Sequence, residues 1–278
     1  MTRSGDAPLL EVSGLTVTAR DGSVLVDDLS LTVRVGERVA LIGESGSGKS
    51  MTGLAIMGLL PEGISATGSV RIAGRDMLAD PDRRLRTVRG DRLSVVFQEP
   101  LTALDPLATI GRQLGEVVQR AARRGDRRLS RTERHAAVRA ALAEVSIAEP
   151  DRIARALPHQ ISGGQRQRVA IAMSLAGDPD LVILDEPTTA LDVTIQAEVL
   201  ALLHRLVDTR HMAVLFIGHD LAVVAQMAER ALVLRRGETV ETGEVATLIG
   251  DPHHPYTQEL VAAARELDEA LGARPVVA

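Results

Sequence analysis

The chain contains no cysteine, which excludes disulfide bonds and cysteine-ligated iron–sulfur or zinc sites. Tryptophan is also absent, and the aromatic residues are two phenylalanines and one tyrosine, so the core must rest on Leu, Val, Ile and Ala. No apolar run approaches the ~18 residues needed to span a bilayer, and residues 1–10 hold no apolar signal core. If the protein works at a membrane, we expect another chain to supply the part that spans it.

Size and charge bound the fold and the partners. With 278 residues, of which 45% are hydrophobic, the chain can bury one large core, or one core with a smaller attached subdomain. The formal net charge of −5 gives no general reason to expect nucleic acid as a partner. The lack of cysteine fits a cytosolic protein without requiring one.

Lysine is nearly absent, because Lys49 is the only one among 32 basic residues. It lies in a glycine-rich run that fits the phosphate-loop pattern G-x-x-x-x-G-K-[ST] at every fixed place, Gly43-Glu44-Ser45-Gly46-Ser47-Gly48-Lys49-Ser50. A compact ammonium can enter such a loop and contact β- and γ-phosphate oxygens, whereas the wide guanidinium of arginine cannot. The run therefore predicts a phosphate site, with the Ser50 hydroxyl on Mg²⁺.

Hydrophobic periodicity predicts an α/β protein. The expected strands are 9–19, 29–38, 39–43, 68–73, 181–184 and 213–217, with a turn at Asp21-Gly22 and a hairpin over 231–242 that turns at Arg236-Gly237. The expected helices are 49–60, 166–175 and one from Pro255 to about Gly272. From about 100 to 175 the pattern is helical and rich in arginine, which indicates a helical insert within the α/β core.

A second informative segment, residues 181–187, is a buried strand that ends in two adjacent carboxylates. Asp185 can hold magnesium, while Glu186 points the other way along the strand and can reach an attacking water. A strand followed by an acidic turn would look the same in isolation. The phosphate loop upstream favours the catalytic interpretation.

A third segment, Ile161-Ser162-Gly163-Gly164-Gln165, precedes a predicted helix and could by itself be a simple N-cap. Together with the phosphate loop and the acidic strand, it resembles the signature motif of ATP-binding cassette (ABC) proteins. Gln98 resembles the Q-loop glutamine, Asp192 in Ala190-Leu191-Asp192 resembles the D-loop, and His219 resembles the switch histidine. The resemblance covers nearly the whole chain, from residue 9 to about 260.

The resemblance implies a P-loop NTPase fold of the ABC type, with a mixed-sheet core, an antiparallel β subdomain and a helical subdomain. It places the ATPase domain at residues 9–250, with the helical subdomain at about 100–175, and a short C-terminal tail at 251–278. The implied cofactors are ATP and Mg²⁺, with the metal held by Ser50, Gln98 and Asp185.

In this family two cassettes face each other head to tail, so the resemblance assigns roles on both sides of a shared ATP. Glu186 would orient or deprotonate the attacking water, and His219 would clamp the γ-phosphate; Lys49 and Gln98 complete the catalytic set. Residues 43–50 and Met51 would bind the nucleotide in the same chain. The γ-phosphate of the partner's ATP would be contacted by the signature residues Ser162, Gly163, Gly164 and Gln165. The D-loop residue Asp192 is also expected to bind nucleotide. Hydrolysis would then open the dimer.

One position departs from the family pattern. The family usually stacks an aromatic side chain on adenine, and counting back from the phosphate loop places that position at Arg20. Arg20 could stack its guanidinium on the purine, or it could be an exposed turn arginine that never touches nucleotide. The sequence leaves both interpretations open.

Several stretches resemble the oligopeptide/dipeptide/nickel importer branch of the family, namely residues 98–106, 158–160, 185–194 and the His-Pro-Tyr-Thr tail motif within 251–257. Asp105 and Leu157 stand where that branch commonly has asparagine and often has tyrosine. The cysteine cluster of longer members is absent. A Pro-rich turn or a metal-binding histidine pair would not explain the Tyr-Thr continuation of the tail. Peptides are therefore the expected cargo, and nickel or a metal chelate comes second.

The resemblance also implies partners: a second ATPase subunit of the same or a homologous chain, two integral membrane permease subunits and an extracytoplasmic substrate-binding protein. The chain would lie on the cytoplasmic face of the cell membrane, with residues 98–107 towards the permease. The arginine-rich stretch 120–139 is either a solvated helix face, which we favour, or a contact with acidic lipid headgroups or the permease. A soluble ABC ATPase of translation or repair, or an exporter cassette, fits less well, because the chain has one cassette, no sustained heptads and no fused membrane domain.

Overall fold

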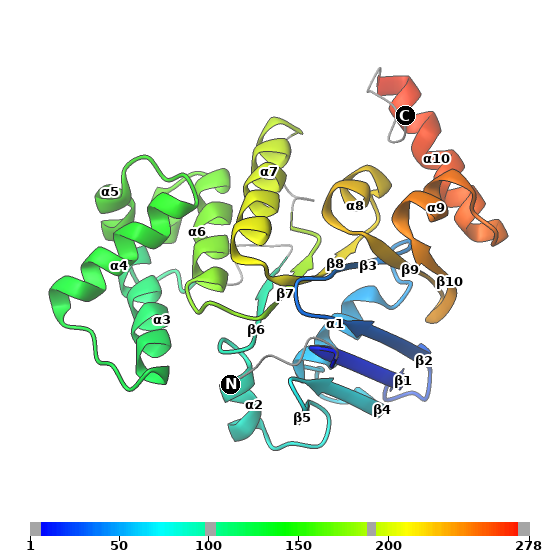
Figure 1. Ribbon diagram of the computed structural model, residues 1–278, viewed down its shortest axis with the longest axis horizontal. Helices are drawn as coiled ribbons and strands as arrows, with labels where there is room; N and C mark the ends of the chain where they lie inside the picture. The colour runs from blue at the N-terminus through cyan, green and yellow to red at the C-terminus, as the bar shows by residue number, and fades with distance from the viewer. Residues whose placement is uncertain (1–6, 98–103, 188–192, 272–278) are drawn as a thin grey trace.

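The computed structural model describes residues 7–97, 104–187 and 193–271 of the chain. A central six-stranded sheet packs on one face against a helix and a second sheet of four strands, and on the other face against further helices (Figure 1). Within these described ranges, no helix is both long enough and apolar enough to cross a membrane.

The central sheet has the strand order β10-β9-β3-β8-β7-β6. Its strands are β3 (Arg38–Ile42), β6 (Leu93–Val96), β7 (Leu181–Asp185), β8 (Ala213–Gly218), β9 (Arg230–Arg235) and β10 (Glu238–Glu244), all parallel except β10. Alternate residues of β7 enter different cores, since Val182 packs in one hydrophobic cluster and Ile183 in the other. Burial on both faces explains the continuous apolar runs that predict these strands.

The second sheet is antiparallel, in the order β2-β1-β4-β5. It consists of β1 (Leu10–Thr18), β2 (Val24–Val33), β4 (Ser65–Ile72) and β5 (Arg75–Asp76). Helix α1 (Lys49–Met57) lies between the two sheets and buries Ala55, Ile56 and Met57 in the cluster that both sheets share. This packing fixes the N-terminus of α1 beside the carboxyl ends of the parallel strands, where ligands of open α/β sheets bind.

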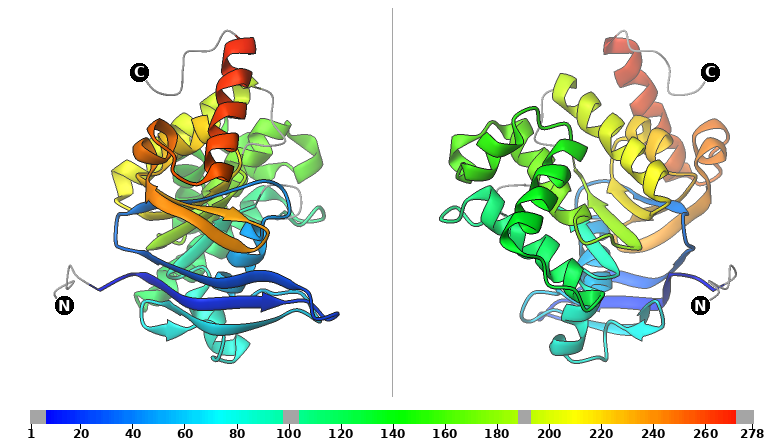
Figure 2. Two further views of the ribbon diagram at one scale, coloured as in Figure 1. Left: turned by 90° about the vertical axis from the view of Figure 1, so that its right-hand side faces the viewer. Right: turned by 60° about the vertical axis from the view of Figure 1, so that its left-hand side comes forward.

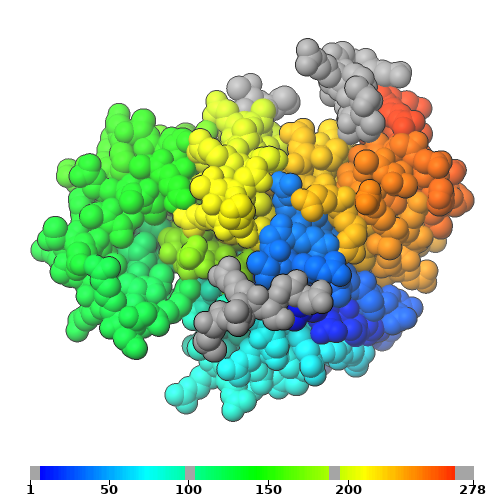
Figure 3. All heavy atoms as spheres, in the orientation of Figure 1, coloured from blue at the N-terminus to red at the C-terminus, as the bar shows by residue number. Residues whose placement is uncertain are grey.

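The remaining helices form distinct groups. One group packs on the face of the central sheet opposite α1: α6 (Gly163–Leu175), α7 (Val193–Arg210), α8 (Leu221–Met227) and α9 (Val245–Gly250). α2 (Asp82–Val88) precedes β6. α3 (Ile110–Arg124), α4 (Arg131–Glu144) and α5 (Pro150–Arg155) pack against one another, and α3 and α4 also contact α6. The short turn η1 (Pro158–Gln160) precedes α6 in the chain. This helical group and α10 (Pro255–Leu271) lie at opposite ends of the molecule (Figures 2 and 3). The described part of residues 104–175 contains no strand, in line with the pattern, while the domain boundaries stay predictions.

The structure corrects several predicted elements. The second strand is β2, which ends at Val33 rather than continuing to 38, because a turn with Gly36 at φ 76° separates it from β3. α1 stops at Met57 instead of 60, because Gly58 takes up φ 62° and its N–H binds the helix carbonyls. The hairpin turn at Arg236-Gly237 is confirmed. β6 and α2 are too short for their periodicity to predict them.

One arginine of the 120–139 stretch has a structural role. The Nε of Arg124 lies 2.8 Å from Asp91 Oδ1, and its Nη1 donates to the carbonyl of Gly177 at 2.7 Å. Its Nη2 donates to the carbonyl of Gly90. The planar fork thus joins the end of α3 to the turn before β6 and to the loop before β7.

We predict that Arg124→Ala lowers the free energy of unfolding by about 1–3 kcal/mol, because three partly buried acceptors lose a charged donor. Arg123→Ala, at an exposed neighbouring position, should change it by less than about 0.5 kcal/mol. Urea unfolding of both variants measures the difference. Equal losses in the two variants would contradict a specific role for Arg124.

Candidate nucleotide-binding site

The phosphate loop joins β3 to α1 and wraps around the side chain of its own lysine. Lys49 is only 4% exposed, and its Nζ donates to the carbonyl oxygens of Gly43 and Glu44, both at 2.7 Å. The hydroxyl of Ser47 lies 3.4 Å from the same Nζ. Burial lowers the pKa of the Lys49 ammonium, and the charges of Glu186 and Asp185 oppose this shift.

The loop depends on glycine where α1 begins. Gly48, the N-cap of α1, has φ 102°, and a Cβ placed on it would lie 2.7 Å from the carbonyl oxygen of Leu25 in β2. A side chain here would therefore meet both backbone strain and a fixed neighbour. No described side chain caps this helix N-terminus, so its N–H groups and the positive end of the helix dipole can face an anion.

The acidic pair at the end of β7 lies beside the loop. The Ser50 hydroxyl is 3.4 Å from Asp185 Oδ1, which joins the start of α1 to the end of β7. Burial, and then the neighbouring charge of Glu186, raise the pKa of Asp185. Glu186 itself has φ 45°, with its backbone N–H bonded to the carbonyl of Ile217 in β8. The chain thus turns sharply at Glu186, in a conformation that non-glycine residues seldom adopt.

His219 follows β8 directly and faces the same site. Its Nδ1 lies 3.2 Å from Glu186 Oε1, and the two side chains are 55% and 18% exposed. Asp220 caps the next helix, α8, by accepting from the N–H groups of Ala222 and Val223. The loop, Glu186 and His219 line one cavity of about 640 Å³, together with Leu25, Met51 and Leu260. Three segments far apart in the sequence therefore converge on it.

The signature residues lie apart from this cavity within the chain. Ser162 is the N-cap of α6, with its Oγ accepting from Gln165 N at 3.3 Å and its own N–H donating to Gln165 Oε1 at 3.1 Å. Ser162 and Gly163 are exposed, and Gly164 and Gln165 are partly so. Further along α6, the buried Gln167 donates to the carbonyl of Pro187 at 2.6 Å, next to Glu186. The N-cap interpretation is thus correct, and it leaves the helix N-terminus open to a group from outside.

The structure does not test the predicted roles of three site residues. Gln98 and Asp192 lie outside the described residues. Arg20 is exposed and lies against Gly63, and it is not among the side chains that line the 640 Å³ cavity, where Leu25 stands instead. Stacking of Arg20 on adenine therefore stays a prediction.

Sequence reasoning missed two contributions from the C-terminal tail. Leu260 of α10 lines the cavity, and the Tyr256 hydroxyl accepts a hydrogen bond from the Glu44 N–H of the phosphate loop at 3.0 Å. Burial raises the pKa of Tyr256, so the phenol stays neutral at ordinary pH. The tail motif itself offered a signal, since it holds the only tyrosine of the chain.

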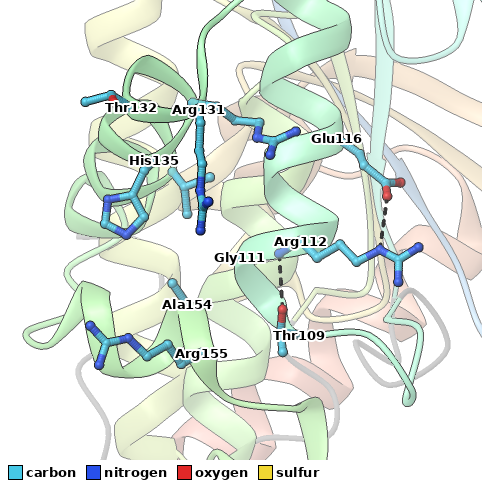
Figure 4. A pocket seen from close by; sticks show the side chains of 11 residues that line it. Thr109, Gly111, Arg112, Glu116, Arg131, Thr132, His135, Ala154 and Arg155 are labelled. Carbon is cyan, nitrogen blue, oxygen red and sulfur yellow. Dashed lines mark hydrogen bonds and ion pairs between the residues drawn. The ribbon is translucent and has the colours of Figure 1, made fainter.

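A second cavity, of about 660 Å³, lies among α3, α4 and α5, away from the phosphate loop (Figure 4). Basic side chains dominate its lining: Arg112, Arg131, Arg134, His135 and Arg155. The arginines of the 120–139 stretch are exposed, as a solvated face requires, although Arg124 also binds backbone carbonyls and Arg131 and Arg134 border this cavity.

This fold and site define a P-loop NTPase of the α/β class, with a lysine-centred phosphate loop facing two carboxylates and a histidine. A family model described as ABC transporter matches residues 26–189. The chain belongs to the ABC transporter family.

Curated relatives match along almost the whole chain. It is 46% identical to the peptidoglycan transport ATP-binding protein YejF of Agrobacterium fabrum over 95% of its length, and 45% identical to the oligopeptide transport ATP-binding protein OppD of Mycobacterium tuberculosis over 97%. These matches cover 48% and 44% of the two relatives, so the chain spans about half their length. A Brucella abortus protein, named as a candidate peptide import ATP-binding protein, is 44% identical, with 98% of this chain and 81% of the relative covered.

Solved structures agree with the fold. The ATP-binding cassette MJ0796, determined as a dimer in a post-hydrolysis state with ADP and Pi, superposes with a TM-score of 0.74 at 30% identity. The match covers 85% of this chain and 98% of the cassette.

We predict that Lys49→Arg weakens nucleotide binding at least about tenfold, because a guanidinium cannot fit between the carbonyls of Gly43 and Glu44. Isothermal titration with ATP checks this, and Arg120→Lys, the reverse exchange at an exposed position, is the control. Unchanged affinity in Lys49→Arg would show that any cation suffices in the loop.

Proposed function

We propose that the chain binds ATP with Mg²⁺ and hydrolyses it as the nucleotide-binding subunit of a membrane importer. The observation that carries the proposal is the cavity where the phosphate loop, Glu186 and His219 meet. We further propose peptides as the cargo, because the relatives described above are named for oligopeptide, peptidoglycan or peptide transport. A nickel or metal-chelate importer is the second candidate, because none of those three relatives is named for nickel transport.

In the proposed reaction, the N–H groups of the phosphate loop and the Lys49 ammonium hold the β- and γ-phosphates. Glu186 orients the attacking water and accepts its proton, and His219, 3.2 Å from Glu186, holds that carboxylate and the γ-phosphate in place. The contact between the two side chains orients each of them towards the same reacting group.

The residues present fit a magnesium ion. Ser50 and Asp185 offer a hydroxyl and a carboxylate 3.4 Å apart, an oxygen-only set of the kind this ion accepts. Asp185 is partly buried, and burial and the charge of Glu186 raise its pKa, so a cation beside it would stabilise the charged carboxylate. Mg²⁺, when bound, neutralises charge on the phosphates. Gln98 is the third proposed ligand.

We propose that a second cassette completes the site. The N-terminus of α6 is exposed, and Ser162 to Gln165 do not line the chain's own cavity. A helix N-terminus with open N–H groups suits the γ-phosphate of a nucleotide bound to the partner. The dimeric state of the MJ0796 cassette supports this arrangement, in which Asp192 would also take part.

We predict that Glu186→Gln lowers ATP turnover by about a hundredfold or more while keeping ATP affinity, because the amide cannot accept the proton from water. The variant should accumulate as an ATP-bound dimer, measured by phosphate release and size-exclusion chromatography. Glu238→Gln, on an exposed strand residue, is the control. Normal hydrolysis in Glu186→Gln would exclude Glu186 as the base.

The proposed contact with two permease subunits involves the loop before α3. Leu107 is 89% exposed, the highest value among the exposed large hydrophobic residues of the described chain. Its loop is held firmly, because the buried Gln113 donates to the carbonyls of Asp105 and Ala108 at 3.0 and 2.8 Å. Asp105 Oδ1 accepts from Leu107 N at 2.9 Å, a bond that an asparagine oxygen could also accept. A rigidly presented apolar side chain suits a protein partner at the membrane.

We predict that Leu107→Asp weakens association with the membrane subunits about tenfold and leaves ATP hydrolysis by the isolated chain unchanged. Val35→Asp, at a residue that is 57% exposed elsewhere on the surface, is the matched control. Co-purification with tagged permease subunits measures the effect. Equal recovery of both variants would exclude the Leu107 loop as the contact with the permease. If the wild type were recovered with ribosomes or DNA instead, the importer proposal would be wrong, and with it the proposed extracytoplasmic binding protein and the location at the cytoplasmic face of the membrane.

A further inference from the structure

The single tyrosine of the chain connects the C-terminal tail to the phosphate loop. Tyr256, the second residue of α10, is 1% exposed. Its hydroxyl lies 3.0 Å from the backbone nitrogen of Glu44, across 212 positions of sequence. The guanidinium of Arg235, at the end of β9, covers the ring at 4.7 Å from its centroid. The side chain therefore has one defined orientation, with its polar end against the loop.

The segment before Tyr256 is anchored separately. The carboxylate of Glu241 in β10 accepts hydrogen bonds from the backbone N–H groups of His253 and His254, at 2.9 and 3.1 Å. His254 Nδ1 in turn accepts from the Tyr256 N–H at 3.2 Å. These bonds fix where α10 begins, and the His254 imidazole takes part in the turn.

Glu44 is held from both sides. Its N–H donates to the Tyr256 hydroxyl at 3.0 Å, and its carbonyl accepts from Lys49 Nζ at 2.7 Å. The orientation of this one residue in the loop is therefore shared between the tail and the lysine that contacts phosphate. One turn further along α10, Leu260 lines the 640 Å³ cavity itself.

We propose that Tyr256 is a positioning residue for the phosphate loop. Its hydroxyl fixes the orientation of Glu44, and Glu44 in turn fixes the position of the Lys49 ammonium through its carbonyl oxygen. The tail is then a structural part of the nucleotide site rather than an appendage to it. The inference rests on the proposed function, since it assigns a residue to the ATP site of this chain.

The test is Tyr256→Phe, which keeps the buried ring and removes only the acceptor of the Glu44 N–H. We expect the Kd for ATP to rise about three- to tenfold, the effect of one lost hydrogen bond that orders the loop. Thr242→Val is the control, because it deletes a hydroxyl from β10 that bonds the carbonyl of Ala231 at 3.2 Å. It should leave the Kd unchanged. Titrations are made well below the unfolding midpoint of the less stable variant.

A second measurement needs no nucleotide. Amide hydrogen exchange over residues 43–48 of the free protein should be faster in Tyr256→Phe than in the wild type, and unchanged in Thr242→Val. A Kd and an exchange rate equal to the wild type would overturn the role of Tyr256, as would a variant that loses thermal stability without a change in either. If the wild type does not bind ATP, the proposed function is wrong. The exchange rates then still test whether the Tyr256 hydroxyl orders the loop through the Glu44 N–H.

Discussion

The buried ammonium of Lys49 is the constraint on which the site depends. A cation that is 4% exposed must find compensation, and it does so in the carbonyl oxygens of Gly43 and Glu44. Both carbonyls can point at one nitrogen only because the chain turns tightly out of β3 before α1 begins. The shape of the loop and the choice of lysine therefore specify each other, which gives a physical reason for the one lysine among 32 basic residues.

The rest of the fold holds that turn in place. α1 packs between the two sheets, and β2 lies directly against Gly48. β7 and β8 place Asp185 and His219 beside the phosphate loop, at the carboxyl ends of the parallel strands. The C-terminal tail adds one more hydrogen bond to the loop, from the Glu44 N–H to the Tyr256 hydroxyl. The antiparallel sheet and the tail thus support the phosphate loop. The N-terminus of α6 is exposed, and we propose that a second cassette binds there.

Much of this could be predicted from the sequence, where the signal is local. The phosphate loop, the acidic end of β7 and the hairpin at Arg236-Gly237 are contiguous patterns. β2 was misplaced because the apolar alternation continues across the turn at Gly36, and only tertiary packing decides where the strand ends. The tail motif points to Tyr256, but its contact with Glu44 spans 212 positions and involves a backbone N–H, so no side-chain pattern identifies the partner. Arg20 is exposed, which the sequence allowed as one of two interpretations, and its contact with adenine stays a prediction.

We propose that ATP hydrolysis in this cavity is coupled to peptide uptake. The most direct measurement is ATP consumption and labelled-peptide accumulation together, in proteoliposomes that contain the chain with its membrane subunits and binding protein. We expect peptide to accumulate against its gradient only when ATP is present, and peptide-loaded binding protein to speed hydrolysis. Hydrolysis that ignores peptide, with no accumulation in the vesicles, would contradict it.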